Sequence, residues 1–359
     1  MSPTGPHPPS THGRTGSPAK VLPITPRVVL DAPVPIRPVR GLANGPDCPA
    51  VIEPPATRYA ETADGVHVAY QVVGDGPIDI LIVPDWVTVI EASWNWEGYP
   101  RLWERLGTLG RLILTDARGS GSSDPDPLGY PATFEHAVDD VAKVLDAIGS
   151  DRAFLIGHTN AAMLACLFAA THPERTAGLV LAGGMASYID RGEGIGFPAS
   201  FRNELADYIV RSWGDPDSER FRLMLPGEDR DEERRREARL ERVAMSPAAV
   251  RQHCEMMLDI DIRPVLPSIQ APTLVLHRTG DRLVPVAAGR YLADHIDGAR
   301  FVELAGDDHF WFLGDVDPML EEMAEFITGT RPAGEPDRVL VTLMFNRHRR
   351  IDRASGPTR

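Results

Sequence analysis

The sequence predicts an α/β protein with a mostly parallel central sheet, helices on both faces of that sheet and a helical insertion. Three observations predict this class. Residues 58–73 alternate apolar and polar side chains around Asp64-Gly65, which is typical of an antiparallel hairpin. Short apolar segments then alternate with helical patterns, as parallel strands that are buried on both faces do. The alternation stops between about residues 186 and 267, where only helical patterns occur.

The elements after the hairpin follow from these patterns in chain order. Strands are expected at residues 78–83, 112–114, 153–156, 179–181, 273–276 and 301–304. Helices are expected at residues 99–109, 133–148, 161–171, 287–296 and 318–328. Right-handed crossovers between parallel strands would distribute these helices over both faces of the sheet.

The insertion at residues 186–267 is interpreted as a helical cap over the carboxyl ends of the strands. Within it, residues 228–242 (EDRDEERRREARLER) carry opposite charges at i,i+4 spacing, which favours an exposed helix. We interpret this charged segment as a solvated face and not as a binding surface. Several apolar residues could line the underside of the cap or serve in ordinary packing: Leu223, Met224, Met245, Met256, Met257 and Leu258.

Composition narrows the range of partners and compartments. The net charge of −14 disfavours nucleic acids and anionic membranes, because both attract basic surfaces. Cys48, Cys166 and Cys254 form no CxxC pair, which favours a reducing compartment. No apolar stretch approaches the roughly 18–20 residues of a membrane span, and residues 1–20 lack the apolar segment of a signal peptide. We therefore expect a cytoplasmic protein, and a homo-oligomer stays possible.

The chain divides into three parts by composition. Fourteen of its 33 prolines lie in residues 1–55, and proline at this density blocks helices and sheet ladders. Residues 1–56 are accordingly predicted to be a disordered leader, unless translation really begins further along the chain. Residues 57–330 form the predicted folded domain, and residues 331–359 form a tail.

Residues 155–162 (LIGHTNAA) join a predicted strand to a predicted helix. A nucleophile elbow has this form, with small residues two before and two after the nucleophile because the turn is tightly packed. Gly157 and Ala161 are both small, and the nucleophile position between them holds Thr159 where serine is usual. His158 is interpreted as a packing residue.

Two later segments supply a matching acid and base. Asp281 follows the strand at 273–276 within a turn, and His309 follows the last strand. A hydroxyl is a weak nucleophile until a base takes its proton, and that imidazole needs a carboxylate to orient it. Thr159, Asp281 and His309 are therefore the predicted catalytic residues. Asp281 could also cap the helix that begins near Pro285, and both roles can coexist.

An acyl-transfer site also needs two backbone N–H groups to hold the developing oxyanion. By position these are the N–H groups of Asn160, directly after the nucleophile, and of Trp86, in the loop after the strand at 78–83. Asp85 precedes Trp86, and its carboxylate would repel an oxyanion unless it points away.

Residues 57–330 resemble the α/β-hydrolase superfamily. The resemblance is carried by the chain order of Thr159, Asp281 and His309, by residues 115–123 (TDARGSGSS) and by residues 169–175 (AATHPER). It implies the α/β-hydrolase fold and a hydrolase that acts on a small apolar ester without a cofactor or a metal. This chain departs from the usual pattern at Thr159, at Ala161 in place of glycine, and at Asp85 in place of glycine. A degenerate ligand-sensing domain is therefore the alternative function, and a cofactorless oxygenase or lyase is a third.

More narrowly, the chain resembles the hydrolase-like domain that is fused ahead of class III adenylate/guanylate cyclases. The cues are residues 277–286 (HRTGDRLVPV), 306–310 (GDDHF) and 337–345 (DRVLVTLMF), the last being similar to the first strand of a cyclase domain. Residues 346–354 (NRHRRIDRA) then differ from the sequence that usually continues this strand in cyclases. Codons for that usual sequence, translated after one added base, give residues 346–354. We interpret the tail as a cyclase domain truncated by a frameshift, with a basic disordered tail as the alternative.

Overall fold

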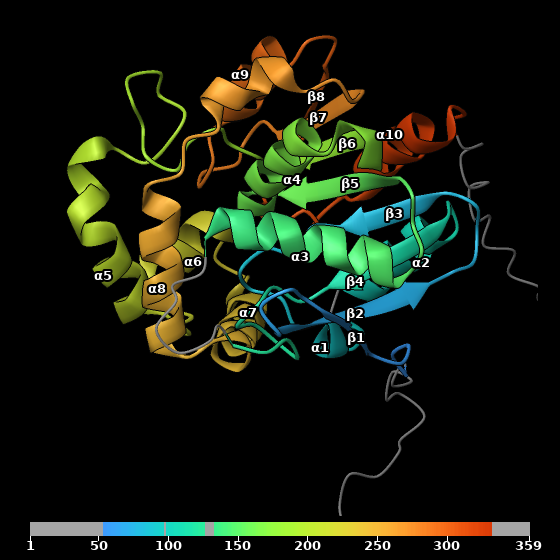
Figure 1. Ribbon diagram of the computed structural model, residues 1–359. Helices are drawn as coiled ribbons and strands as arrows, with labels where there is room; N and C mark the ends of the chain where they lie inside the picture. The colour runs from blue at the N-terminus through green and yellow to red at the C-terminus, as the bar shows by residue number, and fades with distance from the viewer. Residues whose placement is uncertain (1–52, 97, 126–132, 332–359) are drawn as a thin grey trace, which may run out of the picture. The chain divides into compact units, whose positions relative to one another are not determined.

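The computed structural model describes residues 53–96, 98–125 and 133–331 (Figure 1). The leader predicted for residues 1–56 and the tail predicted for residues 331–359 lie outside the described residues, apart from 53–56 and 331. Both assignments therefore stay predictions.

The strands in the described part of the chain form one eight-stranded sheet with the order β1-β2-β4-β3-β5-β6-β7-β8. β1 and β2 form the predicted hairpin, and β2 also runs antiparallel to β4. All pairings from β4 across to β8 are parallel, so the predicted fold class is confirmed. The strands are β1 (Arg58–Glu61), β2 (His67–Val73), β3 (Asp79–Ile82), β4 (Arg111–Thr115), β5 (Ala153–His158), β6 (Thr176–Ala182), β7 (Thr273–Arg278) and β8 (Arg300–Leu304).

Alternate residues of the central strands enter different cores, which explains why these strands are apolar in the middle. On β3 and β5, Leu81 and Leu155 pack into one core cluster, whereas Ile80 and Ile156 pack into the other. All four side chains are fully buried. A period of two along each strand, combined with burial of both faces, favours apolar side chains in the middle of the strand, and polar ones such as Asp79 and His158 stand at its ends.

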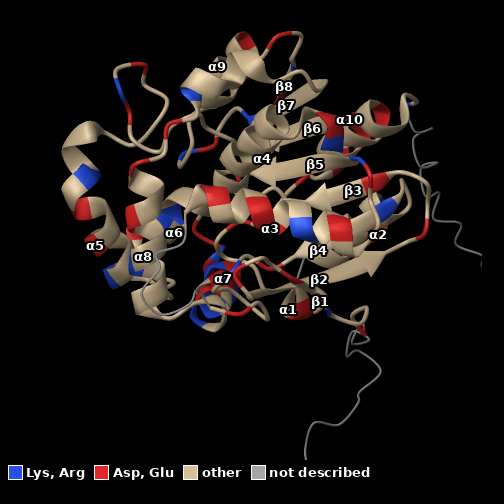
Figure 2. Cartoon of the chain, in the orientation of Figure 1, with Lys and Arg blue, Asp and Glu red and all other residues tan. Residues whose placement is uncertain are grey.

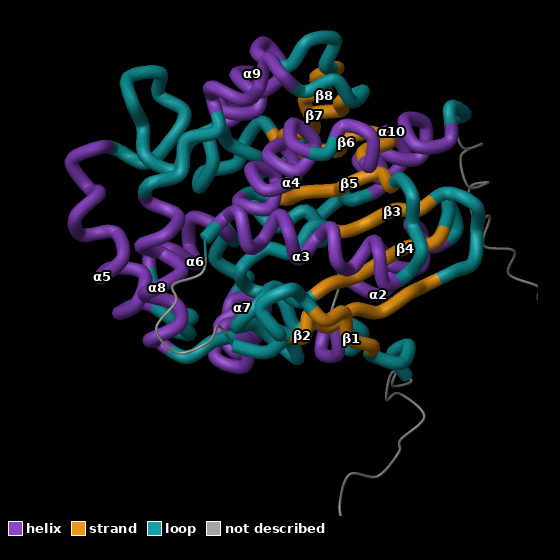
Figure 3. The backbone as a smooth tube through the Cα atoms, in the orientation of Figure 1, coloured by secondary structure: helices purple, strands orange, loops and turns teal. Residues whose placement is uncertain are grey.

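Helices cover both faces of the sheet, as Figure 3 shows with the helices in purple. α3, α4 and α9 supply the core on one face, and α2 and α10 supply it on the other. The four-residue helix α1 was not predicted. None of the described helices combines the length and the apolar character needed to cross a membrane. Their bounds are α1 (Ile90–Ser93), α2 (Tyr99–Gly107), α3 (Phe134–Ala147), α4 (Asn160–Thr171), α9 (Val286–His295) and α10 (Asp317–Thr328).

Four further helices lie between β6 and β7, inside the segment predicted as a cap. In Figure 1 they lie beyond the end of the sheet toward which the arrows of β3 and β5 point. The carboxyl ends of parallel strands are where loops that carry functional residues meet. These helices are α5 (Arg202–Ser212), α6 (Glu219–Met224), α7 (Asp231–Ala244) and α8 (Pro247–Leu258).

The charged segment at 228–242 is helical from Asp231 onward, in α7, but the prediction of a simply solvated face is wrong. Figure 2 shows acidic and basic residues along this helix, and three of them are buried: Arg234, Glu237 and Glu241 are only 5–7% exposed. Arg234 Nη1 donates hydrogen bonds to the carbonyl oxygens of Leu225 and Gly227. The i,i+4 charge pattern could not reveal this, because it is the same whether the partners of the helix are water or other helices.

Candidate active site

Thr159 occupies the turn between β5 and α4 with φ +51° and ψ −107°. Among the described residues it is the only one other than glycine with a positive φ. Side chains rarely adopt this region, and a β-branched side chain is especially disfavoured there. The turn therefore has the strained geometry of a nucleophile elbow, and it holds the Thr159 side chain at the carboxyl edge of the sheet.

Close packing explains the small residue two positions before Thr159. A Cβ added to Gly157 would lie 2.5 Å from the carbonyl oxygen of Ala161 and 2.7 Å from Cα of Ala162. These are backbone atoms of α4, so they cannot move without displacing the helix from the strand.

Replacing Gly157 by alanine is therefore expected to destabilise the protein by about 3 kcal/mol, the upper end of the usual cost of overpacking a core. The measurement is the free energy of unfolding from urea denaturation of both proteins. An unchanged unfolding midpoint would mean that the elbow tolerates a side chain there.

The structure brings the three predicted catalytic residues together in one hydrogen-bonded line. Thr159 Oγ1 lies 3.0 Å from His309 Nε2, and His309 Nδ1 lies 2.9 Å from Asp281 Oδ2. The three residues follow β5, β8 and β7 respectively, and all are buried. Such a line lets an imidazole accept a proton from a hydroxyl while a carboxylate holds its orientation.

The Asp281 carboxylate faces His309, but it does not cap α9, because the N-cap of that helix is Pro285 and receives no side-chain hydrogen bond. Its Oδ1 accepts hydrogen bonds from the backbone N–H groups of Leu283 and Val284, just before α9 begins, at 2.9 and 3.0 Å. Its Oδ2 faces His309. Burial opposes ionisation of Asp281, but His309 and the N–H of Val284 outweigh it and hold the pKa of this carboxyl below its ordinary value. Since an ionised carboxylate only accepts, His309 carries its proton on Nδ1 and leaves Nε2 free to act as a base.

His158 has more than the packing role that the sequence suggested. Its Nε2 lies 2.9 Å from the carbonyl oxygen of His309, and its Nδ1 lies 3.1 Å from Thr159 Oγ1. Because a carbonyl only accepts, Nε2 carries the proton and Nδ1 is an acceptor. Burial, followed by the charge of His309, lowers the pKa of His158 to about 3, so this ring is neutral. Thr159 Oγ1 also lies 3.2 Å from His158 Nε2, so it is not aligned with the lone pair of Nδ1, and His309 is the acceptor that is placed to take the proton.

The region predicted to hold an oxyanion contains a carboxyl group of the protein itself. The N–H of Trp86 donates to Asp85 Oδ1 at 2.7 Å, and the side-chain amide of Asn160 reaches the same oxygen at 3.4 Å. The Asp85 carboxyl therefore points toward the predicted donors. Enclosure within the protein raises the pKa of Asp85 to about 6, opposed in part by the N–H of Trp86. One of the two predicted oxyanion donors is thus already engaged.

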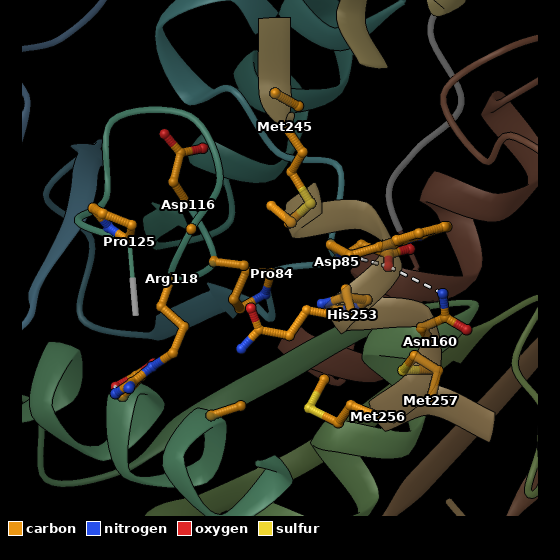
Figure 4. A pocket seen from close by; sticks show the side chains of 18 of the residues that line it. Pro84, Asp85, Asp116, Arg118, Pro125, Asn160, Met245, His253, Met256 and Met257 are labelled. Atoms are coloured by element: carbon orange, nitrogen blue, oxygen red, sulfur yellow. Dashed lines mark hydrogen bonds and ion pairs between the residues drawn. The ribbon is translucent and has the colours of Figure 1, made fainter. Parts of the chain in front are cut away.

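Two cavities meet at this carboxyl. One, of about 520 Å³, is lined by Thr159 and His309, and the other, of about 840 Å³, extends toward α8. Both are lined by Asp85, Trp86 and Asn160. Figure 4 looks into the larger cavity, where a dashed line joins Asp85 to Asn160. Of the residues considered for the underside of the cap, Leu223 and Met224 line the smaller cavity, whereas Met245, Met256 and Met257 line the larger one.

Other nucleophiles and metal sites find no support in the described residues. Burial raises the pKa values of the Cys166 and Cys254 thiols to about 12, so neither thiol ionises at neutral pH. Nowhere in residues 53–96, 98–125 and 133–331 do three His, Cys, Asp or Glu side chains gather in a way that could hold a metal ion. The chemistry available at the site is proton transfer from the Thr159 hydroxyl and attack by its oxygen.

A parallel sheet, an elbow after β5 and a buried hydroxyl–imidazole–carboxylate line together define a hydrolase of the α/β type. The chain belongs to the alpha/beta hydrolase fold family, whose model matches residues 92–316.

Relatives and solved structures agree with this membership. The chain is 29% identical over 154 residues to Epoxide hydrolase 2 of Siraitia grosvenorii, an alignment that covers 41% of this chain and only 44% of that protein. It is 25% identical over 283 residues to the putative carbamate hydrolase RutD of Caulobacter vibrioides, covering 75% of this chain and 97% of the relative. Its structure is similar to that of the esterase RhEst1 from Rhodococcus sp. ECU1013, with a TM-score of 0.60, 25% identity, and coverage of 76% and 98% of the two chains.

Proposed function

We propose that this chain is a cofactor-independent hydrolase of small apolar esters in which Thr159 is the nucleophile. The observation that carries the proposal is the buried line from Thr159 through His309 to Asp281 at the wall of a cavity. Similar proteins named as an esterase and as a carbamate hydrolase support the carbonyl chemistry. Aromatic side chains contribute to the cavity wall, which suits an apolar substrate; they include Trp86, Tyr99, Tyr188, Phe310, Trp311 and Phe312.

In this mechanism His309 Nε2 takes the proton of Thr159 as Oγ1 attacks the ester carbonyl carbon. The tetrahedral intermediate collapses, and His309 returns the proton to the departing alcohol, which leaves the acyl group on Thr159. A water molecule then attacks the acyl-enzyme with His309 as its base, and the acid is released as Thr159 regains its proton. Asp281 stabilises the imidazolium in both halves of the reaction.

The backbone N–H groups of Trp86 and Asn160 are the proposed oxyanion donors. In the described structure the Asp85 carboxyl competes with the substrate for the first of them. An ionised carboxylate at this place opposes a developing oxyanion. The proposed ester activity is therefore slow at neutral pH for as long as Asp85 keeps this position and its charge.

Replacing Thr159 by serine is expected to raise kcat/KM for p-nitrophenyl acetate and butyrate by about tenfold, because serine removes a β-branch from a strained backbone position and a methyl group from the attack path. The measurement is the initial rate of the wild type, Thr159→Ser and Thr159→Ala. A Thr159→Ala protein that matches the wild type would show that this hydroxyl is not the nucleophile.

The second candidate function is a ligand-sensing domain that has lost turnover. It is favoured by the Asp85 carboxyl at the predicted oxyanion donor and by the β-branched residue at the elbow. It also fits the resemblance to domains fused to class III cyclases, which we retain as a proposal. If the wild type hydrolyses no ester of a broad panel above the buffer rate, this second function replaces the first. A cyclase continuation in the shifted reading frame of the genomic DNA would support the truncated fusion.

A further inference from the structure

Two buried carboxylates face the same side of α7, because Glu237 and Glu241 are four residues apart. Both line the cavity that holds Thr159 and His309. Glu241 is matched in charge: its Oε2 lies 2.8 Å from Nη2 of the Arg220 guanidinium and also accepts a hydrogen bond from the N–H of Gly214. That guanidinium lies over the ring of Phe221 at 4.8 Å.

Glu237 has no such match. Its Oε1 accepts a hydrogen bond of 2.9 Å from the indole N–H of Trp96, and no ion pair within the described ranges reaches it. Burial raises the pKa of Glu237 to about 7; the indole of Trp96 opposes this, the charge of Glu241 adds to it, and Arg236 of the same helix lowers it slightly. A carboxyl group that is only 5% exposed and has no cationic partner is costly to ionise, so it favours a ligand that supplies the missing charge.

The rest of the cavity lining carries more acidic than basic side chains, which favours a cationic ligand. Burial, followed by the charges of Glu237 and Asp85, raises the pKa of the Tyr99 hydroxyl, so both carboxyl groups act on this side chain. The ring of Tyr99 stacks against Trp103 and Phe312, so the attraction for a cation comes from the carboxyl groups. The lining holds four carboxyl groups and the single guanidinium of Arg220, so a cationic ligand improves the charge balance and an anionic ligand worsens it; the carboxyl groups are those of Asp85, Glu219, Glu237 and Glu241.

We propose that the catalytic cavity takes esters that carry an alkylammonium group and that Glu237 pairs with this group. This inference rests on the proposed ester hydrolysis, because it names the substrate class of the same site. The protein already contains one such arrangement: the Arg220 guanidinium lies over the Phe221 ring and pairs with Glu241. The ammonium group of the ligand would pair with Glu237 in the same way.

The test uses two matched series of acetate esters. One series is made from ω-trimethylammonio alcohols with two to six carbons, and the other from alcohols in which a tert-butyl group replaces the ammonium group at nearly the same size. We expect the wild type to show a kcat/KM at least tenfold higher for the best cationic ester than for its neutral match. Glu237→Gln keeps an acceptor for the Trp96 indole, and it should bring this ratio close to one. Glu232→Gln changes an exposed carboxylate of the same helix and should keep the wild-type ratio.

Binding separates this inference from the proposed function. The corresponding ethers cannot be hydrolysed, and calorimetry measures their affinity for the wild type, Glu237→Gln and Glu232→Gln. If no ester is turned over but the cationic ether binds at least tenfold more tightly than the neutral one and Glu237→Gln removes the difference, the hydrolase proposal fails and the cation site stands. If neutral esters are turned over as well as cationic ones, or the preference survives in Glu237→Gln, the inference is overturned and the hydrolase proposal stands. Absence of any cationic preference in both assays also overturns it.

A measurement on the wild type alone guards against a misfolded variant. Tetramethylammonium ion should inhibit turnover of a neutral ester competitively, or displace the bound cationic ether, at concentrations at least tenfold lower than those at which neopentanol does so. Equal effects of the two compounds would contradict the proposal.

Discussion

Replacing His309 by alanine is expected to lower kcat for p-nitrophenyl esters by about 10³- to 10⁴-fold. The reason is geometric: Nε2 of His309 lies 3.0 Å from Thr159 Oγ1, and it is the one acceptor of that hydroxyl that a carboxylate orients. His158 is also within reach of the hydroxyl, but its pKa of about 3 makes it a poor base. The measurement is kcat of the purified wild type and His309→Ala, from the release of p-nitrophenol.

Two variants control this prediction. Asp281→Asn keeps the size of the side chain but no longer favours a proton on Nδ1 of His309, so a similar loss of kcat is expected. His295→Ala changes an exposed histidine at the end of α9 and should leave the rates unchanged. If both His309→Ala and Asp281→Asn hydrolyse esters at the wild-type rate while circular dichroism shows them folded, the proposed catalytic line is wrong.

Replacing Asp85 by glycine is expected to raise kcat/KM for neutral esters by about 10²-fold at pH 8, since one oxyanion donor is commonly worth 10²–10³ in rate. The substitution removes a carboxyl that accepts the N–H of Trp86 at 2.7 Å, and it also removes a negative charge from the place where charge develops in the transition state. The substitution keeps both the N–H of Trp86 and the cavity. The measurement is kcat/KM of the wild type, Asp85→Gly and Asp85→Asn between pH 5 and pH 9.

The pH dependence of this gain has a defined sign. The pKa of Asp85 is raised to about 6, so the carboxyl is ionised at pH 8 and mostly protonated at pH 5. The ratio of the kcat/KM of Asp85→Gly to that of the wild type should therefore be largest above pH 6 and should decrease below it. A ratio near one at every pH would mean that Asp85 does not limit turnover.

The pH dependence of folding stability tests the protonation state of Asp85 independently of activity. A raised pKa means that ionisation of Asp85 costs folding free energy, so its contribution to stability is present below pH 4 and is lost as the pH rises through about 6. Asp85→Asn should consequently melt at a higher temperature than the wild type at pH 8, with a smaller difference at pH 4. This comparison holds even if the protein has no esterase activity.

The proposed cation site offers an explanation for Asp85, which stands where the α/β-hydrolase pattern usually has glycine. Asp85 and Glu237 place two carboxyl groups without cationic partners from the described residues in the lining of one cavity. Neither group favours a neutral ester, since each is costly to ionise without a partner. A substrate with a positive charge relieves this cost as it binds.

The fold class and the chain positions of the proposed catalytic residues could both be predicted from sequence patterns. Short continuous apolar segments and helices with a period of 3.6 are local patterns, so the strands from β3 to β8 and most helices could be predicted from nearby residues. Thr159, Asp281 and His309 each follow a predicted strand, and the carboxyl ends of parallel strands meet at one edge. Their convergence therefore follows from the topology.

The electrostatics of the site could not be predicted from the sequence, because they depend on contacts between distant parts of the chain. The direction of the Asp85 carboxyl depends on a rotamer and on Asn160, which lies 75 residues further along the chain. The contrast between Glu237 and Glu241 depends on Arg220, which belongs to a different helix. The charge pattern of α7 is the same in water and in a packed interior, so it could not predict which carboxylates are buried. Local periodicity is read from neighbours in the chain, whereas burial, pKa values and cavities arise from contacts between elements that are distant in it.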